Sequence, residues 1–456
     1  MSMFIDSVSG GSLSPANRRG AWWFRCCAAG LLALGLLRAE PAPEGGSLDQ
    51  GTNTPVTLAD AVRAATLRNW DLLAAQADVD RATAGQIIAQ QFPNPTLSVS
   101  VTKAPINSQS GATILGNGYF ERSYDQIAAV NQLFEIGGKR SARKAAAKVG
   151  AEAARARFAD ARRQLQLGVT RAYVAAVLAA ENARILRASS DSLRREAAVA
   201  ETRLSAGDIS RADRDQIQIS ADRFELDAVQ AEAAAQGARI QLELLLGIRD
   251  PRGGIVLSST VEALAGTAPP PESSRPSLDR PDVEAARLAV RQAEENIRLQ
   301  KALRVPDPTV LAQYEREPPD QTSTVGFGVS FPLPLWNRNR GGISAAEADY
   351  RQAETNARRT EAEALAEISR ARREFEAARL RADRYAAQIV PQSAEVARSV
   401  RFAYGRGGAS LVDLLTAERN DNEVRLAAAV ASADLANARA ALRAALNLPP
   451  DHEPSS

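Results

Sequence analysis

Two seven-residue stretches with the same spacing decide the fold of this chain: GDISRAD at residues 207–213 and GGASLVD at residues 407–413. Glycine tolerates the left-handed conformation that commonly ends a helix. Three residues on, serine favours the start of a new helix, and the aspartate beyond it completes a capping box. Each stretch therefore predicts the tip of a helical hairpin. Its recurrence at matched positions predicts an internal duplication.

A second landmark is also repeated. PNPT at residues 93–96 and PDPT at residues 306–309 each follow helical sequence and precede alternating apolar and polar residues, which predict strands. Proline cannot continue a helix, so we expect the chain to pass from helix to strand at Pro93, Pro95, Pro306 and Pro308. The predicted unit is helix, strand, strand, helix, tip, helix, and the chain uses it twice.

These landmarks divide the sequence into six parts. They are a signal peptide (1–39), an N-terminal linker (40–56), a first repeat (57–265, strands about 95–135, tip 207–213), an inter-repeat linker rich in proline (266–281), a second repeat (282–447, strands about 308–334, tip 407–413) and a C-terminal tail (448–456).

Composition favours long, closely packed helices. Hydrophobic residues make up 45% of the chain but aromatic residues only 5%, which suits coiled-coil-like layers of small side chains. Residues 141–206 lack proline and would extend on the order of 100 Å as one helix. Pro391 is the only proline within the long helical segments. The net charge of +2, with both signs interleaved, predicts no role in nucleic-acid binding.

The N-terminus carries a predicted export signal. Arg18 and Arg19 precede an apolar stretch at residues 26–37, and Ala39 is a small residue suited to cleavage. The stretch is too short to span a bilayer but fits a secretory signal. Arginines at both its ends are unusual for a signal, so a buried helix is the alternative. A lipid anchor is disfavoured because neither cysteine follows the stretch.

Residue types argue against enzymatic chemistry. The two cysteines, Cys26 and Cys27, lie in the signal segment, both methionines precede it, and the one histidine is His452 in the tail. The predicted mature chain therefore lacks the ligands of soft metals and the groups of a Ser-His-Asp or Cys-His site. Gly137-Gly138-Lys139 is followed by arginine, unlike a phosphate-binding loop. We expect no enzyme activity, no resident metal and no cofactor.

The predicted strands are of the length that crosses a membrane when tilted. Four strands cannot close a barrel, and an open edge in lipid leaves backbone groups unpaired. If the strands cross a membrane, several copies must therefore pool them. An exported chain of this kind indicates the outer membrane of a Gram-negative cell. A soluble α+β protein with a small sheet is the alternative.

On these features the chain resembles the TolC-like outer-membrane efflux proteins. The resemblance rests on TLADA at residues 57–61, the two tips, and LLLG at residues 244–247, so that it covers both repeats in order. Within that family, FEIGGKR at 134–140 and FPLPLWNRN at 331–339 resemble the CzcC-like heavy-metal (cation) efflux branch.

The resemblance implies a mainly α fold with a membrane β-barrel, assembled as a homotrimer. Each copy would give four strands to a twelve-stranded outer-membrane barrel, continuous with a long periplasmic α-helical barrel. The tips would form the periplasmic entrance, where a periplasmic adaptor (membrane fusion) protein and an inner-membrane resistance-nodulation-division pump dock. The chain would then be a passive duct embedded in outer-membrane lipid.

The resemblance also implies roles for residues at the tips. Asp213 and Asp413 would place carboxylates around the entrance as a gate or selectivity ring, besides capping their helices. Tyr404 matches a tyrosine that helps to close the mouth in family members. A closing arginine of the family is replaced by Ala409, with Arg406 nearby. The hairpin-tip residues expected to contact the adaptor are Gly207, Ser210, Gly407 and Ser410.

Three other functions stay open at this stage. Within the family, a duct for drugs or other small organic compounds competes with export of divalent heavy metals. Outside it, a periplasmic helical adaptor has one hairpin flanked by other domains, whereas this chain has two equal copies. A coiled-coil scaffold leaves the paired strands and the signal segment without a purpose.

Overall fold

The computed structural model describes residues 55–102, 125–266, 278–317 and 322–449. The expected signal peptide, most of the N-terminal linker, most of the inter-repeat linker and most of the tail, with His452, lie outside these ranges. Within them, no helix combines the length and the apolar character that crossing a membrane requires.

The first repeat contains helices and strands in the expected order. Its elements are α1 (Leu58–Arg68), α2 (Trp70–Gln90), β1 (Thr96–Thr102), β2 (Asp125–Leu133), α3 (Lys139–Ser205), α4 (Arg211–Leu245) and the short α5 (Val261–Ala265). The helix α3 runs without interruption for 67 residues, as the absence of proline predicts. Pro93 and Pro95 lie between α2 and β1.

The second repeat has the same order of helix, strand, strand and helical hairpin, with a single helix before its strands and one interruption in the hairpin. Its elements are α6 (Pro281–Ala302), β3 (Thr309–Glu317), β4 (Thr322–Ser330), α7 (Arg340–Arg384), the π-helical turn η1 (Tyr385–Ile389), α8 (Val390–Gly405) and α9 (Leu411–Ala445). Pro306 and Pro308 lie between α6 and β3. The turn η1 ends just before Pro391, where the backbone N–H of Val390 bonds to the carbonyl of Tyr385, five residues back. A π turn is one way in which a helix accommodates a residue that cannot donate.

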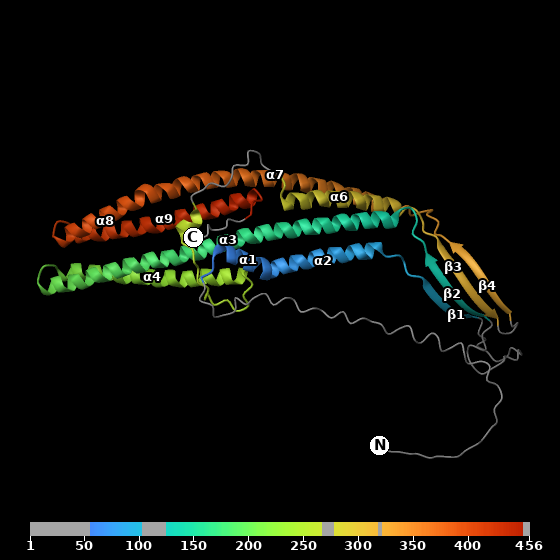
Figure 1. Ribbon diagram of the computed structural model, residues 1–456, viewed down its shortest axis with the longest axis horizontal. Helices are drawn as coiled ribbons and strands as arrows, with labels where there is room; N and C mark the ends of the chain where they lie inside the picture. Colours follow the sequence, from blue (N-terminus) through green and yellow to red (C-terminus); the bar gives the residue numbers. More distant parts are fainter. Residues whose placement is uncertain (1–54, 103–124, 267–277, 318–321, 450–456) are drawn as a thin grey trace, which may run out of the picture. The chain divides into compact units, whose positions relative to one another are not determined.

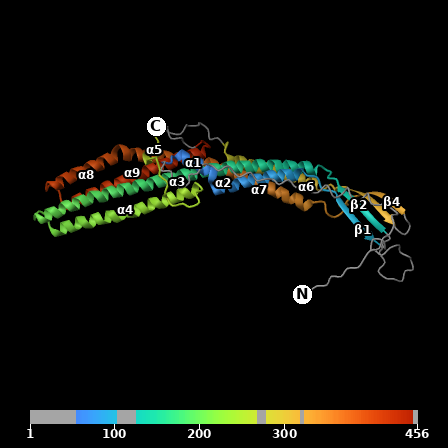
Figure 2. The ribbon, with the colours of Figure 1, turned by 60° about the horizontal axis from the view of Figure 1, so that its bottom comes forward.

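The helices pack through alanine-rich stripes. In Figures 1 and 2 the pair α3–α4 lies beside the pair α8–α9, and α3 also contacts α2, α6 and α9. The buried positions of α4 include Ala221, Ala228 and Ala235, which recur every seven residues. Such a repeat keeps one narrow face against a neighbouring helix and allows close approach. The expected packing of small side chains is therefore observed.

A denser core joins the middle of the two repeats. Tyr173 of α3 is fully buried among residues of α1, α4, α5 and α9, and its hydroxyl donates to the carbonyl of Val56 at 2.7 Å. Arg280, almost wholly buried before α6, pairs with Asp282 and with Glu367 of α7, both at 2.7 Å. Two carboxylates compensate the buried guanidinium, which would otherwise be costly to desolvate.

The four strands form one antiparallel sheet in the order β1-β2-β3-β4. Directly opposite residues share a face, so the register assigns whole rows of side chains. One face carries the row Leu97, Val130, Ala312 and Phe327 and the row Val99, Ala128, Tyr314 and Val325. The other face carries the row Ser98, Ala129, Gln313 and Gly326 and the row Ser100, Ile127, Glu315 and Thr324. The sheet therefore has an apolar face and a more polar face.

None of the helices in the described ranges covers the apolar face of the sheet. Phe327 is 83% exposed, and Leu97, Val99 and Val325 are each about two-thirds exposed. In a water-soluble sheet the apolar face is normally the buried one. An uncovered apolar face with strands of seven to nine residues is the pattern of a sheet whose outside meets lipid.

The connections from strand to long helix touch each other across the duplication. Gly137, between β2 and α3, has φ of +71°, and a Cβ there would lie 2.8 Å from the Cβ of Val305. Lys139 pairs with Asp307 at 2.7 Å, and the other oxygen of Asp307 accepts the backbone N–H of Ile136 at 2.9 Å. The motif at 134–140 thus fixes the first junction against the second.

We predict that Gly137→Ala destabilises the protein more than Gly138→Ala. Both positions have positive φ, which costs a residue with a Cβ about 1–2 kcal/mol. Only at position 137 would the new methyl group also collide with Val305, since at position 138 the nearest atom, the Oγ of Ser141, is 3.5 Å away. The midpoint of thermal loss of the helical circular dichroism signal measures the difference. Equal midpoints for the two variants would contradict the described junction.

Candidate functional site at the hairpin tips

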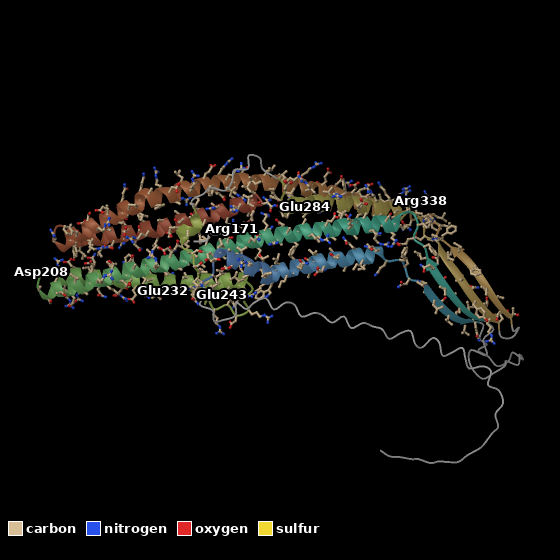
Figure 3. All side chains as sticks on the ribbon, viewed as in Figure 1. Arg171, Asp208, Glu232, Glu243, Glu284 and Arg338 are labelled. Atoms are coloured by element: carbon tan, nitrogen blue, oxygen red, sulfur yellow. The ribbon has the colours of Figure 1, made fainter. Side chains whose placement is uncertain are left out.

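Both tips end and restart a helix by the same backbone device. After α3, the backbone N–H of Gly207 donates to the carbonyl of Leu204, and the N–H of Asp208 donates to the carbonyl of Arg203. After α8, the N–H groups of Gly407 and Gly408 donate in the same way to the carbonyls of Tyr404 and Ala403. These are the paired bonds of a Schellman motif. Gly207 and Gly407 have φ of +81° and +76°, with open space where a Cβ would be. Backbone conformation, not crowding, requires glycine at both positions. Figure 3 labels Asp208 in the first tip.

Ser210 and Ser410 begin α4 and α9 with complete capping boxes, as the sequence predicts. The Ser210 hydroxyl accepts the N–H of Asp213 at 3.1 Å and donates to its carboxylate at 2.8 Å. In the second tip the corresponding distances between Ser410 and Asp413 are 3.2 and 2.7 Å. Each aspartate also accepts its serine's backbone N–H. The capping role of both aspartates is therefore confirmed.

These hydrogen bonds favour the charged form of Asp413. The side-chain bond from Ser410, and then the backbone bond from the same residue, hold the pKa of the Asp413 carboxyl below its ordinary value of 3.8. Asp413 is exposed and Asp213 half-buried. The second tip therefore carries a fixed, solvent-facing negative charge at neutral pH.

The two tips meet on one apolar cluster. We call it the tip cluster: Ala197 and Ala200 of α3, Ile217 of α4, and Leu411 and Leu414 of α9 are buried in it. Ile209 from the first tip and Val400, Tyr404 and Leu415 from the second hairpin pack against it. The hairpins are therefore held together at their ends as well as at the central core.

Tyr404 of the second repeat also contacts an arginine of the first repeat. The guanidinium of Arg203, at the end of α3, lies 5.5 Å from the centre of the Tyr404 ring, within cation–π range. Partial burial raises the pKa of the Tyr404 hydroxyl above its ordinary value of 10.0, the charge of Arg203 lowers it, and those of Asp213 and Glu196 raise it. Charges of the first repeat therefore act on the Tyr404 hydroxyl of the second.

The arginine that contacts the Tyr404 ring is Arg203 and not the nearby Arg406. Arg406 stacks on Phe402 of its own helix, 4.3 Å from the ring centre, and Ala409 carries no charge. Arg203 was not singled out, because its contact with Tyr404 joins residues about two hundred positions apart. The sequence near Arg203 shows only that it lies one helical turn before Gly207 of the first tip.

Ion pairs hold the two helices of each hairpin near the tip. The Nε of Arg401 in α8 donates to Glu418 in α9 at 2.8 Å, and the Glu418 side chain is only 12% exposed. In the other hairpin, Arg214 of α4 lies 3.4 Å from Glu201 of α3. The pair of Arg401 and Glu418, with its largely buried carboxylate, restrains its hairpin more than a fully exposed pair would.

One group of carboxylates lies far from the tips. Oxygens of Asp125, Glu315 and Glu317 lie within 4.8 Å of one another at the ends of β2 and β3, and Thr102 donates to Asp125 at 3.3 Å. Oxygen ligands of this kind suit hard cations. The sequence analysis missed the group because only the strand register brings it together. Acidic side chains often gather without an ion, so the geometry alone assigns none.

Comparisons with known proteins agree with this architecture. A family model described as outer membrane efflux protein matches residues 61–248 and 277–448. The cobalt-zinc-cadmium resistance protein CzcC of Cupriavidus metallidurans is 26% identical over 375 residues, which cover 82% of this chain and 85% of that protein.

Solved structures share the fold. CusC matches with a TM-score of 0.73 at 18% identity, over 88% of this chain and 95% of that one. The open state of the MtrE outer membrane channel of Neisseria gonorrhoeae matches with a TM-score of 0.71 at 22% identity, over 86% and 89%. The expected mainly helical fold with four antiparallel strands is confirmed.

The duplicated hairpins, the sheet with an uncovered apolar face and a family match over most of the chain lead to one conclusion. The chain belongs to the outer membrane efflux protein family, the TolC-like channels, and is a non-enzymatic efflux channel of the outer membrane that extends into the periplasm.

Proposed function

We propose that three copies of the chain form a passive duct that conducts divalent heavy-metal cations from the periplasm to the outside. The observation that carries the assembly is the open sheet: among the described strands, β1 and β4 each pair on one side only. An unpaired strand edge in lipid is costly, and strands from further copies remove it by closing a barrel. Three copies would supply twelve strands.

In this assembly the helical hairpins line a channel below the barrel, and the tips surround its periplasmic entrance. Asp213 and Asp413 repeat in each copy, which places carboxylates around a narrow mouth. Such a ring concentrates cations because the field is focused where the surrounding dielectric is low. The partners that fit the entrance are a periplasmic adaptor and an inner-membrane resistance-nodulation-division pump. The turns at Gly207, Ser210, Gly407 and Ser410 are the proposed adaptor contacts.

The proposed substrate class rests on the relationship to CzcC and on the charge of the tips. The sequence places cysteine and methionine only within its first 27 residues and its one histidine at position 452, so the duct offers carboxylates to passing ions. Carboxylates attract divalent cations without selecting one, so selection belongs to the pump and adaptor. Export of small organic compounds is the competing substrate class for the same duct.

Deleting the gene separates these substrate classes. We expect growth to become sensitive to divalent metals among zinc, cobalt, cadmium, nickel and copper, while tolerance of dyes and antibiotics stays unchanged. The minimal inhibitory concentration of each compound, with the gene restored on a plasmid as the control, is the measurement. Sensitivity to dyes and antibiotics with normal metal tolerance would keep the duct and overturn its proposed substrate.

We further propose that Arg203 and Tyr404 hold the entrance closed, and predict that Arg203→Ala opens it. Removing the guanidinium loses the contact between the repeats, worth about 0.5–1 kcal/mol at a partly exposed site. The single-channel conductance of the purified protein in a planar bilayer should rise. Arg406→Ala is the matched control, because Arg406 stacks within its own helix and its loss should leave the conductance unchanged. Equal conductance for both variants would remove Arg203 from the gate.

The lowered pKa of Asp413 predicts how the second tip responds to acid. A carboxylate whose folded pKa lies below its unfolded value stabilises the fold above the unfolded pKa and loses this effect as pH falls through the folded value. Amide hydrogen exchange at the start of α9 should therefore stay slow from pH 7 to pH 5 and accelerate, beyond its intrinsic pH dependence, only below the ordinary value of 3.8. Ser410→Ala should move this acceleration to higher pH; an unchanged profile would contradict the capping account.

A further inference from the structure

The connection between β4 and α7 exposes large apolar side chains. In residues 331–339, Trp336 is 92% exposed, and Phe331, Leu333 and Leu335 are each 58–65% exposed. Figure 3 labels Arg338 in this connection. A surface indole is normally covered by something, since it is among the largest apolar groups in a protein. We call residues 331–339 the tryptophan loop.

The matching connection in the first repeat shows that the turn itself does not require these residues. Between β2 and α3 the chain makes the same strand-to-helix turn in five residues, 134–138, whereas the tryptophan loop has nine. The shorter connection also exposes Phe134 and Ile136, but it has no indole. The extra length and Trp336 therefore need a reason other than turning the chain.

The tryptophan loop is held in place by hydrogen bonds on both sides of Trp336. The N–H of Leu335 bonds to the carbonyl of Leu333 at 2.8 Å, and the N–H of Asn339 to the side chain of Asn337 at 3.0 Å. The side-chain amide of Asn339 also donates to the carbonyl of Gln300 in α6, at 2.8 Å. An exposed group that is already ordered loses less entropy on binding.

The apolar side chains of the loop continue the apolar face of the sheet. Val325, Phe327 and Val329 project from that face of β4, and Phe331 follows with the same two-residue spacing. Pro332 and Pro334 have no backbone N–H, and the N–H of Leu335 is hydrogen-bonded to Leu333. This stretch therefore presents few unpaired donors to an apolar medium. Two exposed arginines follow Trp336: Arg338 within the loop and Arg340 just beyond it.

We propose that the tryptophan loop is a membrane-interface anchor that enters the periplasmic leaflet of the outer membrane. An indole has an apolar body and one N–H donor, which suits the boundary between acyl chains and headgroups. Arg338 and Arg340 lie where they meet lipid phosphates, which guanidinium groups bind well. The anchor fixes the depth of the sheet in the bilayer. The inference rests on the proposed function in one respect, that the strands cross the outer membrane.

Four tryptophans in the sequence, Trp22, Trp23, Trp70 and Trp336, make the proposal testable by fluorescence. The reporter variant W22F/W23F/W70F keeps only Trp336. The matched control W22F/W23F/W336F keeps only Trp70, which is half-exposed at the start of α2. A third variant replaces all four by phenylalanine and adds Phe327→Trp, which reports on the apolar face of the sheet. Full-length protein is reconstituted in phosphatidylethanolamine–phosphatidylglycerol vesicles, with or without brominated acyl chains.

We expect brominated lipid to quench Trp336 strongly and Trp70 not at all. Bromine near the glycerol backbone should quench Trp336 more than bromine near the chain ends. The proposal is overturned if Trp336 is as weakly quenched as Trp70 while the F327W reporter is quenched, which would leave the strands in the membrane. Blue-shifted but unquenched Trp336 emission would instead indicate a second copy as its cover. If neither Trp336 nor the F327W reporter is quenched, the membrane placement of the strands fails as well.

Discussion

The constraint on which the rest of this structure depends is that backbone donors and acceptors cannot be left unpaired in lipid. Within the residues that the structure describes, the sheet of one chain has an uncovered apolar face and two strands, β1 and β4, that are each paired on one side only. A single copy thus presents to a membrane both an apolar surface that suits lipid and two edges that do not. Closing those edges with further copies removes the conflict. It would also bring the long helices α3 and α7, which follow β2 and β4 after connections of five and nine residues, around a common axis.

The two repeats share the same turn between helices at their tips, but the side chains around corresponding turns differ. Both tips turn the chain with the same Schellman motif and capping box. Their surroundings differ, because Tyr404 of the second repeat receives Arg203 of the first. The same holds at the other ends of the long helices. There a short junction pinned by Lys139 and Asp307 corresponds to a longer loop that exposes Trp336.

Local features of this fold could be predicted from the sequence, whereas contacts between repeats could not. Glycine, serine and aspartate at fixed spacing were enough for both tips, since a cap involves only neighbouring residues. The alternation of apolar and polar residues was enough to place the strands. It does not give the strand register, which brings Asp125 close to Glu315 and Glu317. The pairing of Arg203 with Tyr404 depends on how two hairpins pack, which the sequence around either residue does not specify. Pro391 was visible as an exception within a long helix, but its accommodation by a π turn depends on the path of the backbone.

The mass of the particle extracted from the outer membrane tests most directly whether copies of the chain pool their strands. Native mass spectrometry in a mild detergent resolves particles of one, two or three chains, and the 456 residues of the sequence have a mass of 48.6 kDa. The account predicts three chains, whose strands together close a twelve-stranded barrel. A stable, detergent-solubilised single chain would contradict it, because β1 and β4 would then keep unpaired edges within the membrane.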